Sequence, residues 1–265
     1  MYRHAVVKGY FYPDNAPELT NFFESSKSTT LIKDPISVIV PHAGYIYSGR
    51  TAFKTLSSID IPESVLILGP NHTGLGRQVA LYCKGVWESP FGDVPVDSEL
   101  ADALCDNYII SKDFAAHVNE HSLEVIVPML KYLNPYVKIV PLVIGLSTYE
   151  ECLKVAERIA EILTKTKEKV LIVVSSDMNH YEDSETTLKK DNIAIDTIIH
   201  LDGKKLYEVI EKYNITMCGF APAIIAIESS KILGASEGIL IGHTHSGVVS
   251  GNNREVVGYA GIIIK

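Results

Sequence analysis

Short, continuously apolar segments rich in Val and Ile recur along the chain, and amphipathic helical patterns lie between them. Apolar runs of this length without alternation are typical of strands buried on both faces of a sheet. Alternation of such strands with helices predicts an α/β fold, a three-layer α/β/α arrangement around a mostly parallel central sheet. The predicted strands are Ser37–Val40, Val65–Leu68, Lys138–Ile144, Val170–Ser175, Gly238–Ile241 and Val256–Lys265, with Gln78–Tyr82 as a weaker candidate.

The predicted helices carry one apolar and one charged face. In the clearest, Tyr149–Glu168, the apolar face includes Val155 and Ile159, and Glu and Lys residues fill the other face. Pro222 is expected near the start of its helix, where its missing N–H needs no partner, and Gly234 is expected to end that helix. The other predicted helices are Arg50–Ser58, Ser98–Asn107, His121–Leu133, Thr186–His200 and Pro222–Leu233.

No internal repeat, low-complexity segment or linker is visible in the 265 residues, so we predict one domain over residues 1–265. The segment Cys83–Asp97 is long and contains two Pro and two Gly. This composition indicates a lid or an excursion at the edge of the sheet, and it does not mark a domain boundary.

Charge and cysteine usage narrow the class of protein. The net charge of −8 argues against nucleic acid or an anionic membrane as a partner. No signal peptide is expected, and no apolar run reaches the roughly 18 to 20 residues of a transmembrane helix. The four cysteines are scattered without a Cys-x-x-Cys pair, which indicates a reduced, cytoplasmic protein.

Four residues with metal-ligating side chains follow predicted strands or lie in Gly-rich turns: His42, His72, His180 and Cys218. Ligands of α/β proteins bind beyond the carboxyl ends of the strands, so parallel strands would bring the first three segments to one sheet edge. Imidazole and thiolate side chains suit a soft or borderline transition metal. The alternative is a hydrogen bond within the turn for His42, a loop His capped by Asn71 for His72, and an exposed side chain for His180.

Cys218 precedes a predicted helix, and a thiol near a helix N-terminus is expected to have a lowered pKa. The alternative is a buried Cys that acts as a small apolar residue. Asp177 lies close enough in sequence to orient His180. A nucleophilic Cys218–His180–Asp177 triad is a further alternative, but it leaves His42 and His72 without a role.

Two other histidine pairings are weaker candidates. Glu120 and His121 open a predicted helix, where Glu120 either supports a metal ligand or favours the helix dipole. His243 and His245 alternate along a strand and share one face, which suits either a metal or a half-exposed polar surface. There is no Gly-x-Gly-x-x-Gly, Walker A or Gly-x-Ser-x-Gly string, so neither a phosphate cradle nor a serine-hydrolase nucleophile is indicated.

Eight strings between Gly9 and Gly261 together resemble the Memo (mediator of cell motility) family. They are GYFYPDNAPEL, PHAGYIYSG, GPNHTG, WESPFGDVPVD, EHSLE, SSDMNHY, CGFAPA and VVGYAG. The archaeal and bacterial members are called AmmeMemoRadiSam system protein B. The resemblance implies a fold similar to class III extradiol ring-cleaving dioxygenases, which hold Fe(II) with two His and one Glu. The GHTHSG string around His243 and His245 departs from the family pattern.

The resemblance also implies roles for individual residues. His42 and His72 take the two His ligand positions, and Cys218 stands where the dioxygenases have a carboxylate. His180 takes the acid/base position with Asp177 beside it. The remaining residues expected in the pocket or supporting the ligands are Phe11, Tyr47, Asn71, Glu120 and His121.

Three functions follow from the resemblance and the residues. The first is a metal-dependent oxidoreductase with Fe or Cu as cofactor, because exchanging a carboxylate for a thiolate softens the site. The second is a binding module that uses the same pocket, without metal, for a peptide or small anion. The third is a subunit of a modification system with a radical S-adenosylmethionine enzyme as partner.

Overall fold

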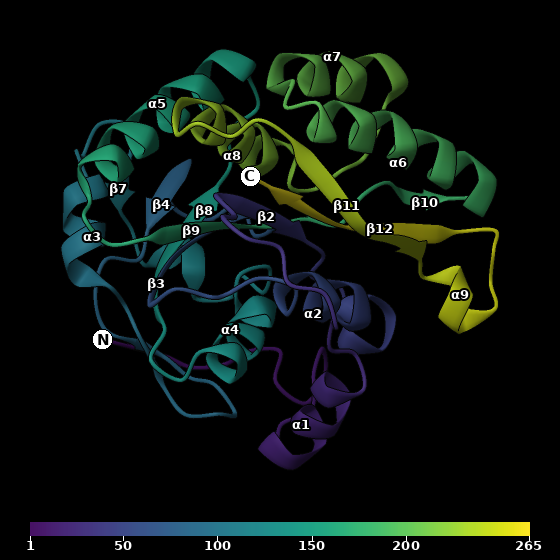
Figure 1. Cartoon of the computed structure of the whole chain (residues 1–265), viewed down its shortest axis with the longest axis horizontal. Coiled ribbons are helices and arrows are strands. Elements are labelled where there is room, and N and C mark those ends of the chain that lie inside the picture. Colours follow the sequence, from purple (N-terminus) through teal and green to yellow (C-terminus); the bar gives the residue numbers. More distant parts are fainter.

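A nine-stranded mixed sheet forms the centre of the computed structural model, which describes residues 1–265 (Figure 1). Its strand order is β10-β12-β2-β9-β3-β8-β4-β7, and β11 also pairs with β12. The four inner strands β2, β9, β3 and β8 are mutually parallel. The strands of this sheet are β2 (Ser37–Val40), β3 (Ser64–Pro70), β4 (Val79–Leu81), β7 (Ser111–Lys112), β8 (Lys138–Ile144), β9 (Val170–Ser175), β10 (His180–Glu182), β11 (Gly238–His245) and β12 (Val256–Ile264).

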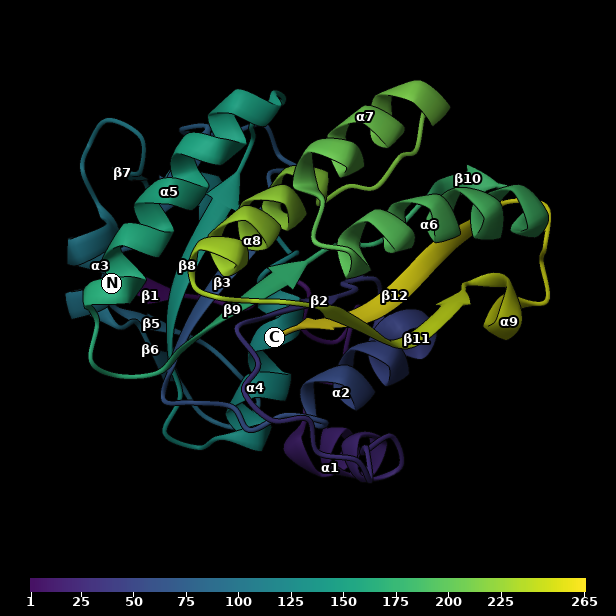
Figure 2. The same cartoon turned by 45° about the horizontal axis from the view of Figure 1, so that its top comes forward.

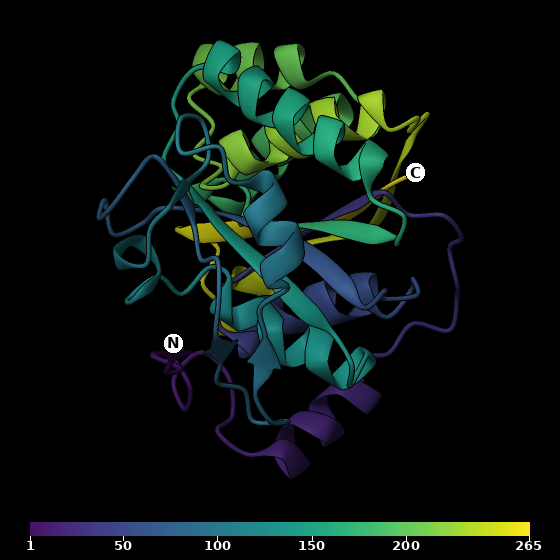
Figure 3. The same cartoon turned by 90° about the vertical axis from the view of Figure 1, so that its left-hand side faces the viewer.

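Helices cover both faces of this sheet, so the predicted three-layer α/β/α arrangement is confirmed (Figures 1 and 3). On one face α5, α8, α7 and α6 pack side by side in that order (Figure 2). The other face carries α2, α4 and the N-terminal α1. The helices are α1 (Ala16–Glu24), α2 (Arg50–Leu56), α3 (Ser98–Leu104), α4 (Val127–Leu133), α5 (Tyr149–Lys165), α6 (Ser184–Ile199), α7 (Gly203–Tyr213), α8 (Phe220–Ile232) and the short α9 (Gly247–Ser250).

The inner strands are mostly apolar because helices cover both sides. Every residue of β2 and β3 is buried, as are all but the first residues of β8 and β9. They belong to one contiguous cluster of 69 buried hydrophobic residues. Each fully buried Val, Leu or Ile contributes roughly 1.5–3 kcal/mol, so this cluster is the main source of stability.

All six main strand predictions and the weaker Gln78–Tyr82 correspond to strands of the sheet. Pro222 lies in the first turn of α8, and Gly234 follows that helix with a φ of +100°. Three helices were not predicted, α1, α7 and the short α9. Helix α7 has a clear apolar face of Leu206, Val209 and Ile210, but it begins at a glycine, which does not favour a helix.

The segment Cys83–Asp97 is an excursion at the edge of the molecule. It forms strands β5 (Val86–Trp87) and β6 (Val94–Pro95), which join β1 (Tyr2–Arg3) in a small three-stranded sheet. Trp87 is buried in this arrangement, and the Arg3 guanidinium lies 4.3 Å from the centre of its ring. The lid interpretation is therefore wrong, because β5 and β6 pair with each other and with β1, and Trp87 anchors the segment in the interior.

The predicted helix His121–Leu133 begins six residues later than expected. A 3₁₀ turn at Glu124–Ile126 leads into α4, with Pro128 in the first turn of that helix. The Glu120 carboxylate accepts a hydrogen bond from the Ser122 N–H, which closes a local turn instead. The interpretation that Glu120 and His121 open a helix is wrong, and both residues lie in a loop.

We predict that buried His117 makes the protein less stable in mild acid. Its Nε2–H donates to the Ala80 carbonyl, and burial lowers its pKa from 6.5 to about 4. Between these two values the unfolded chain binds a proton that the folded chain does not, so stability falls as pH drops from 6.5 to 4, by up to about 3 kcal/mol.

Urea unfolding of His117→Gln across this pH range tests the prediction, because the Gln amide can still donate to Ala80. We expect a shallower pH dependence than in the wild type. His200→Gln, at an exposed position, is the control and should leave the slope unchanged. If the free energy of unfolding of His117→Gln depends on pH as steeply as that of the wild type, His117 is not the source of the acid sensitivity.

Candidate metal centre

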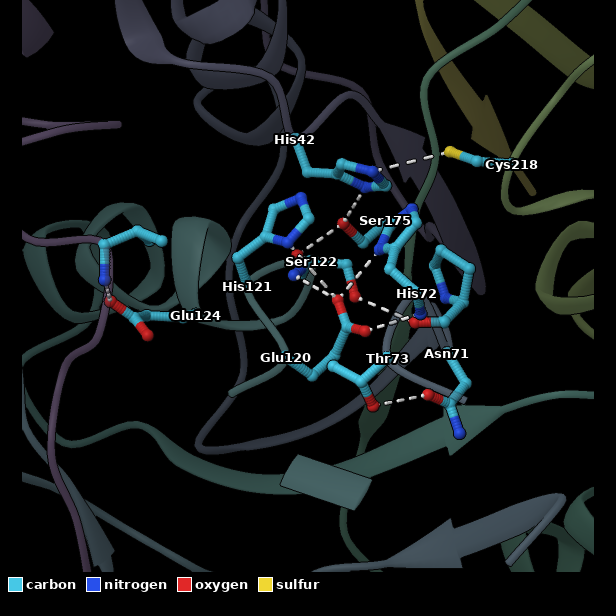
Figure 4. Close-up of polar contacts among 12 residues, drawn as sticks. His42, Asn71, His72, Thr73, Glu120, His121, Ser122, Glu124, Ser175 and Cys218 are labelled. Carbon is cyan, nitrogen blue, oxygen red and sulfur yellow. Dashed lines mark hydrogen bonds and ion pairs between the residues drawn. The ribbon is translucent and has the colours of Figure 1, made fainter. Parts of the chain in front are cut away.

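His42 and His72 meet because they follow strands that share a neighbour. His42 follows β2 and His72 follows β3, and both strands pair in parallel with β9. Asp177 lies in the loop that follows β9, and His180 begins β10 directly after that loop, so three loops leave the same edge of the sheet. Cys218 reaches this edge from the loop between α7 and α8. Ligand atoms of His42, His72 and Cys218 all lie within 4.8 Å of one another (Figure 4).

Hydrogen bonds fix which ring nitrogen of His42 faces the group. Its Nδ1 lies 2.8 Å from Ser175 Oγ, and that hydroxyl donates its own proton to the Ser122 carbonyl at 2.6 Å. Ser175 Oγ must therefore accept from Nδ1–H of His42. The Nε2 atom keeps its lone pair and lies 3.4 Å from Cys218 Sγ.

His72 is oriented in the same way by Glu120. One carboxylate oxygen lies 2.9 Å from His72 Nδ1, and the other accepts the His72 backbone N–H at 2.6 Å. Because an ionised carboxylate can only accept, Nδ1–H is the donor and Nε2 is left free. The His72 side chain is 33% exposed, so the group is open to solvent on this side.

Cys218 can approach the loop that follows β9 because the next residue, Gly219, has no side chain. A Cβ at Gly219 would lie 2.5 Å from the Ser176 side chain and 2.8 Å from the Ser175 carbonyl. The Asp177 backbone N–H points at Cys218 Sγ at 3.3 Å. Any larger residue at 219 would push the thiol away from His42.

The charges in this group are set mainly by burial. Burial and the nearby His72 and His121 lower the pKa of His42, so its imidazole is neutral. Burial and the Asp177 carboxylate raise the pKa of the Cys218 thiol. The prediction of a lowered Cys218 pKa is wrong, because the desolvation of the thiolate outweighs the N-terminus of α8.

Asp177 supports the backbone of the His42 loop. Its Oδ1 accepts the N–H groups of His42 and Ala43 at 2.8 and 3.3 Å, and burial raises its pKa. The His180 ring is held by another residue, since its Nδ1 lies 2.8 Å from the Thr216 carbonyl. The interpretation that Asp177 orients the His180 imidazole is therefore corrected.

A second group of ligand-type atoms converges at His72, Glu120 and His121, but it is already satisfied internally. The Glu120 oxygens accept from His72 and from the Ser122 N–H. Burial raises the pKa of Glu120, but the hydrogen bonds and charge of His72 outweigh it and hold the pKa at about 2. Glu120 therefore orients His72. The His121 ring stacks on His72 with ring centres 4.7 Å apart.

The remaining predicted residues differ in their distance from the group. Phe11 packs on His121 with ring centres 4.9 Å apart, so it borders the site. Tyr47 is 40% exposed. The Asn71 side chain bonds Thr73, Gly74 and Leu75 and so closes the turn that carries His72. Neither convergent group contains His243 or His245.

Sequence reasoning missed the residues that support the ligands. Ser175 and Ser122 hold His42, and a buried Arg3–Glu124 ion pair holds the loop with Glu120. Arg3 Nη1 lies 2.5 Å from Glu124, and Arg3 Nη2 donates to the Glu120 carbonyl at 2.6 Å. These partners lie more than 50 residues apart in sequence, and no local pattern marks them.

An α/β/α fold with a His/His/Cys group at the carboxyl edge of parallel strands defines a class of protein with a candidate transition-metal site. Comparison with known families and structures then identifies the family. Residues 3–263 match the profile of the family described as Memo-like protein, and the chain belongs to this family.

Relatives agree with this assignment, and a solved structure shares the fold. A MEMO1 family protein of Aquifex aeolicus is 42% identical, with 98% of each chain covered. One of Methanocaldococcus jannaschii is 38% identical, with 99% of each chain covered. The crystal structure of an uncharacterized Escherichia coli K12 protein shares the fold, with a TM-score of 0.57 and 9% identity, over 86% of this chain and 99% of that one. None of the helices is long and apolar enough to cross a membrane.

We predict that Glu124→Gln destabilises the protein by about 3–5 kcal/mol, because it leaves the Arg3 guanidinium buried without its charge partner. Urea unfolding at neutral pH measures the change. The control is Glu185→Gln, whose ion pair with Lys189 is exposed, and it should have no measurable effect. Equal stabilities of the two variants would contradict a structural role for the buried pair.

Proposed function

We propose that this Memo family protein binds an Fe or Cu ion through Nε2 of His42, Nε2 of His72 and Sγ of Cys218, and that it carries out redox or dioxygenase-related chemistry on a small molecule. The observation that carries the proposal is the convergence of these three atoms within 4.8 Å. The two His tautomers are already fixed with Nε2 free.

The spacing of the donor atoms fits a shared ion. Metal–N bonds of about 2.05 Å and a metal–S bond of about 2.3 Å in a tetrahedral arrangement separate nitrogen and sulfur by about 3.5 Å. His42 Nε2 and Cys218 Sγ are 3.4 Å apart. This pair therefore needs no large movement to bind one ion, and the His72 donor lies within 4.8 Å of both.

The donor set favours Fe or Cu over a hard cation. Imidazole suits Fe, Cu and Zn, and thiolate is a soft ligand, whereas Mg²⁺ and Ca²⁺ prefer oxygen. When bound, the ion supplies electron transfer and open coordination positions for a substrate. Cys218 replaces the carboxylate of the dioxygenase triad, so we do not assign catechol ring cleavage to this protein.

The protein's own residues would prepare the site for such chemistry. Ser175 and Glu120 hold the two imidazoles in one orientation, which limits the reorganisation needed on binding. His180 donates Nδ1–H to the Thr216 carbonyl, so its Nε2 is the atom that can take up a proton. We assign His180 the role of proton acceptor on this basis.

A cavity lined by the end of α7 and the segment that leads into α8 borders the thiol, and none of His42, His72 and His180 lines it. It has a volume of about 440 Å³ and includes Cys218, Thr216, Met217 and Phe220 in its lining. Small-molecule sites are typically concave and mostly apolar with a few polar groups, and they have volumes of about 300–1,000 Å³.

We predict one Fe or Cu ion per chain after anaerobic purification, measured by elemental analysis. The content should fall to background in His42→Ala and in Cys218→Ala. Cys105→Ala is the matched control, because that thiol lies outside the group, beside Asn107. Wild-type protein that stays metal-free under physiological metal supply would refute the proposal.

We also predict that Glu120→Gln weakens metal affinity about 10- to 100-fold, because a neutral amide orients His72 less firmly than a carboxylate. Competition with a coloured chelator measures the affinity. Glu157→Gln, at an exposed position on α5, should bind as the wild type does. Wild-type affinity in Glu120→Gln would show that the His72–Glu120 hydrogen bond does not support the site.

A further inference from the structure

His243 bonds a buried carboxylate that no other part of the candidate site uses. Its Nε2 lies 2.9 Å from Oδ2 of Asp191, a residue of α6 that is fully buried. A buried carboxylate needs hydrogen-bond partners, and Asp191 has two. The second is the backbone N–H of Asn179, which donates to Oδ1 at 2.9 Å.

The sheet makes room for this carboxylate at Gly258. A Cβ at that position would lie 1.9 Å from Asp191 Oδ2, so only glycine permits the approach. Gly258 on β12 pairs with His245, and Ala260 pairs with His243. Paired residues of antiparallel strands share a face, so His243 and Gly258 both face α6.

Asn179 connects this carboxylate to the His180 ring. Its side-chain oxygen accepts the N–H of Thr216 at 3.0 Å and the Thr216 hydroxyl at 3.1 Å. Thr216 in turn accepts twice from His180, through its hydroxyl from the backbone N–H at 2.7 Å and through its carbonyl from Nδ1 at 2.8 Å. The direction of each bond is fixed, because carbonyl oxygens only accept.

We propose that His243 and Asp191 are positioning residues that hold His180 in the tautomer with Nδ1–H bound and Nε2 free. The chain of hydrogen bonds runs from His243 through Asp191, Asn179 and Thr216 to His180. The inference rests on the proposed role of His180 as proton acceptor, since only the free Nε2 can take up a proton.

The strained residue next to His180 is consistent with a chain that holds this loop. Tyr181 has a φ of +60°, which is costly for a residue with a side chain. Such a conformation persists only where the surrounding contacts over-determine it. The hydrogen bonds of His180 to Thr216 are contacts of this kind.

The other role open to His243, as half of a metal-binding pair with His245, has no support. No group of converging ligand atoms includes either residue. The Nδ1 atom of His245 is buried without a hydrogen-bond partner, and His245 is not part of the chain to His180. His245 therefore offers a matched control on the same strand and the same face.

The test is the tautomer of His180 in metal-free, ¹⁵N-labelled protein, measured by long-range ¹H–¹⁵N correlation spectra of the imidazoles. His180→Gln assigns the signal. In the wild type we expect the proton on Nδ1 alone. In His243→Leu and Asp191→Ala we expect a mixture of both tautomers, because the Asn179–Thr216 link is no longer anchored.

Two further variants separate positioning from general damage to the fold. His243→Gln can still donate to Asp191 and should restore the wild-type tautomer, and His245→Leu should not alter it. If Asp191→Ala does not fold, His243→Leu decides the outcome. A wholly Nδ1-protonated His180 in folded His243→Leu would overturn the inference.

This measurement is independent of metal content. A metal-free wild type with the predicted tautomer changes would refute the metal proposal and leave the positioning roles in place. One metal ion per chain with an unchanged His180 tautomer in His243→Leu would support the metal proposal and refute the positioning roles.

Discussion

The parallel pairing of β2, β9 and β3 is the constraint on which the candidate site depends. These three neighbouring strands end at one edge of the sheet, and a histidine of the site lies in or directly after the loop that follows each of them. Their burial under two layers of helices fixes the register, because a shifted strand would expose apolar side chains. The hydrophobic core therefore sets the distance between His42 and His72, and loop hydrogen bonds then set the orientation of each ring.

The three histidines share one structural device. His42, His72 and His180 each donate Nδ1–H to an oxygen, on Ser175, Glu120 and Thr216 respectively, and each keeps Nε2 free. Each acceptor is itself held, Ser175 by the Ser122 carbonyl, Glu120 by backbone N–H groups and Thr216 by Asn179. A ring held in this way needs little rearrangement to bind an ion or a proton, which is the usual function of such supporting hydrogen bonds.

The central strands and the ligand-type residues could be predicted from the sequence. The residues that orient those ligands or hold their loops could not. Strands buried on both faces leave continuous apolar runs, and His or Cys at strand ends stands out from its neighbours. The Ser175–Ser122, Arg3–Glu124 and His243–Asp191 contacts join residues 50 to 120 positions apart, and each residue type is ordinary at its position. The Cys218 pKa was predicted wrongly because helix position is visible in sequence, whereas burial is not.

The burial of Cys218 and Asp177 explains why a cation suits this place. Both are acidic groups, and burial raises the pKa of each. Asp177 accepts two backbone N–H bonds, whereas the Cys218 sulfur accepts one backbone N–H and otherwise lies near the Ser176 hydroxyl, the Asp177 carbonyl and the neutral His42. A bound cation next to Cys218 would favour its thiolate, as a coordinated metal does for any thiol ligand. The charge of this position therefore depends on the ion, because burial keeps the Cys218 thiol protonated until a cation favours its thiolate.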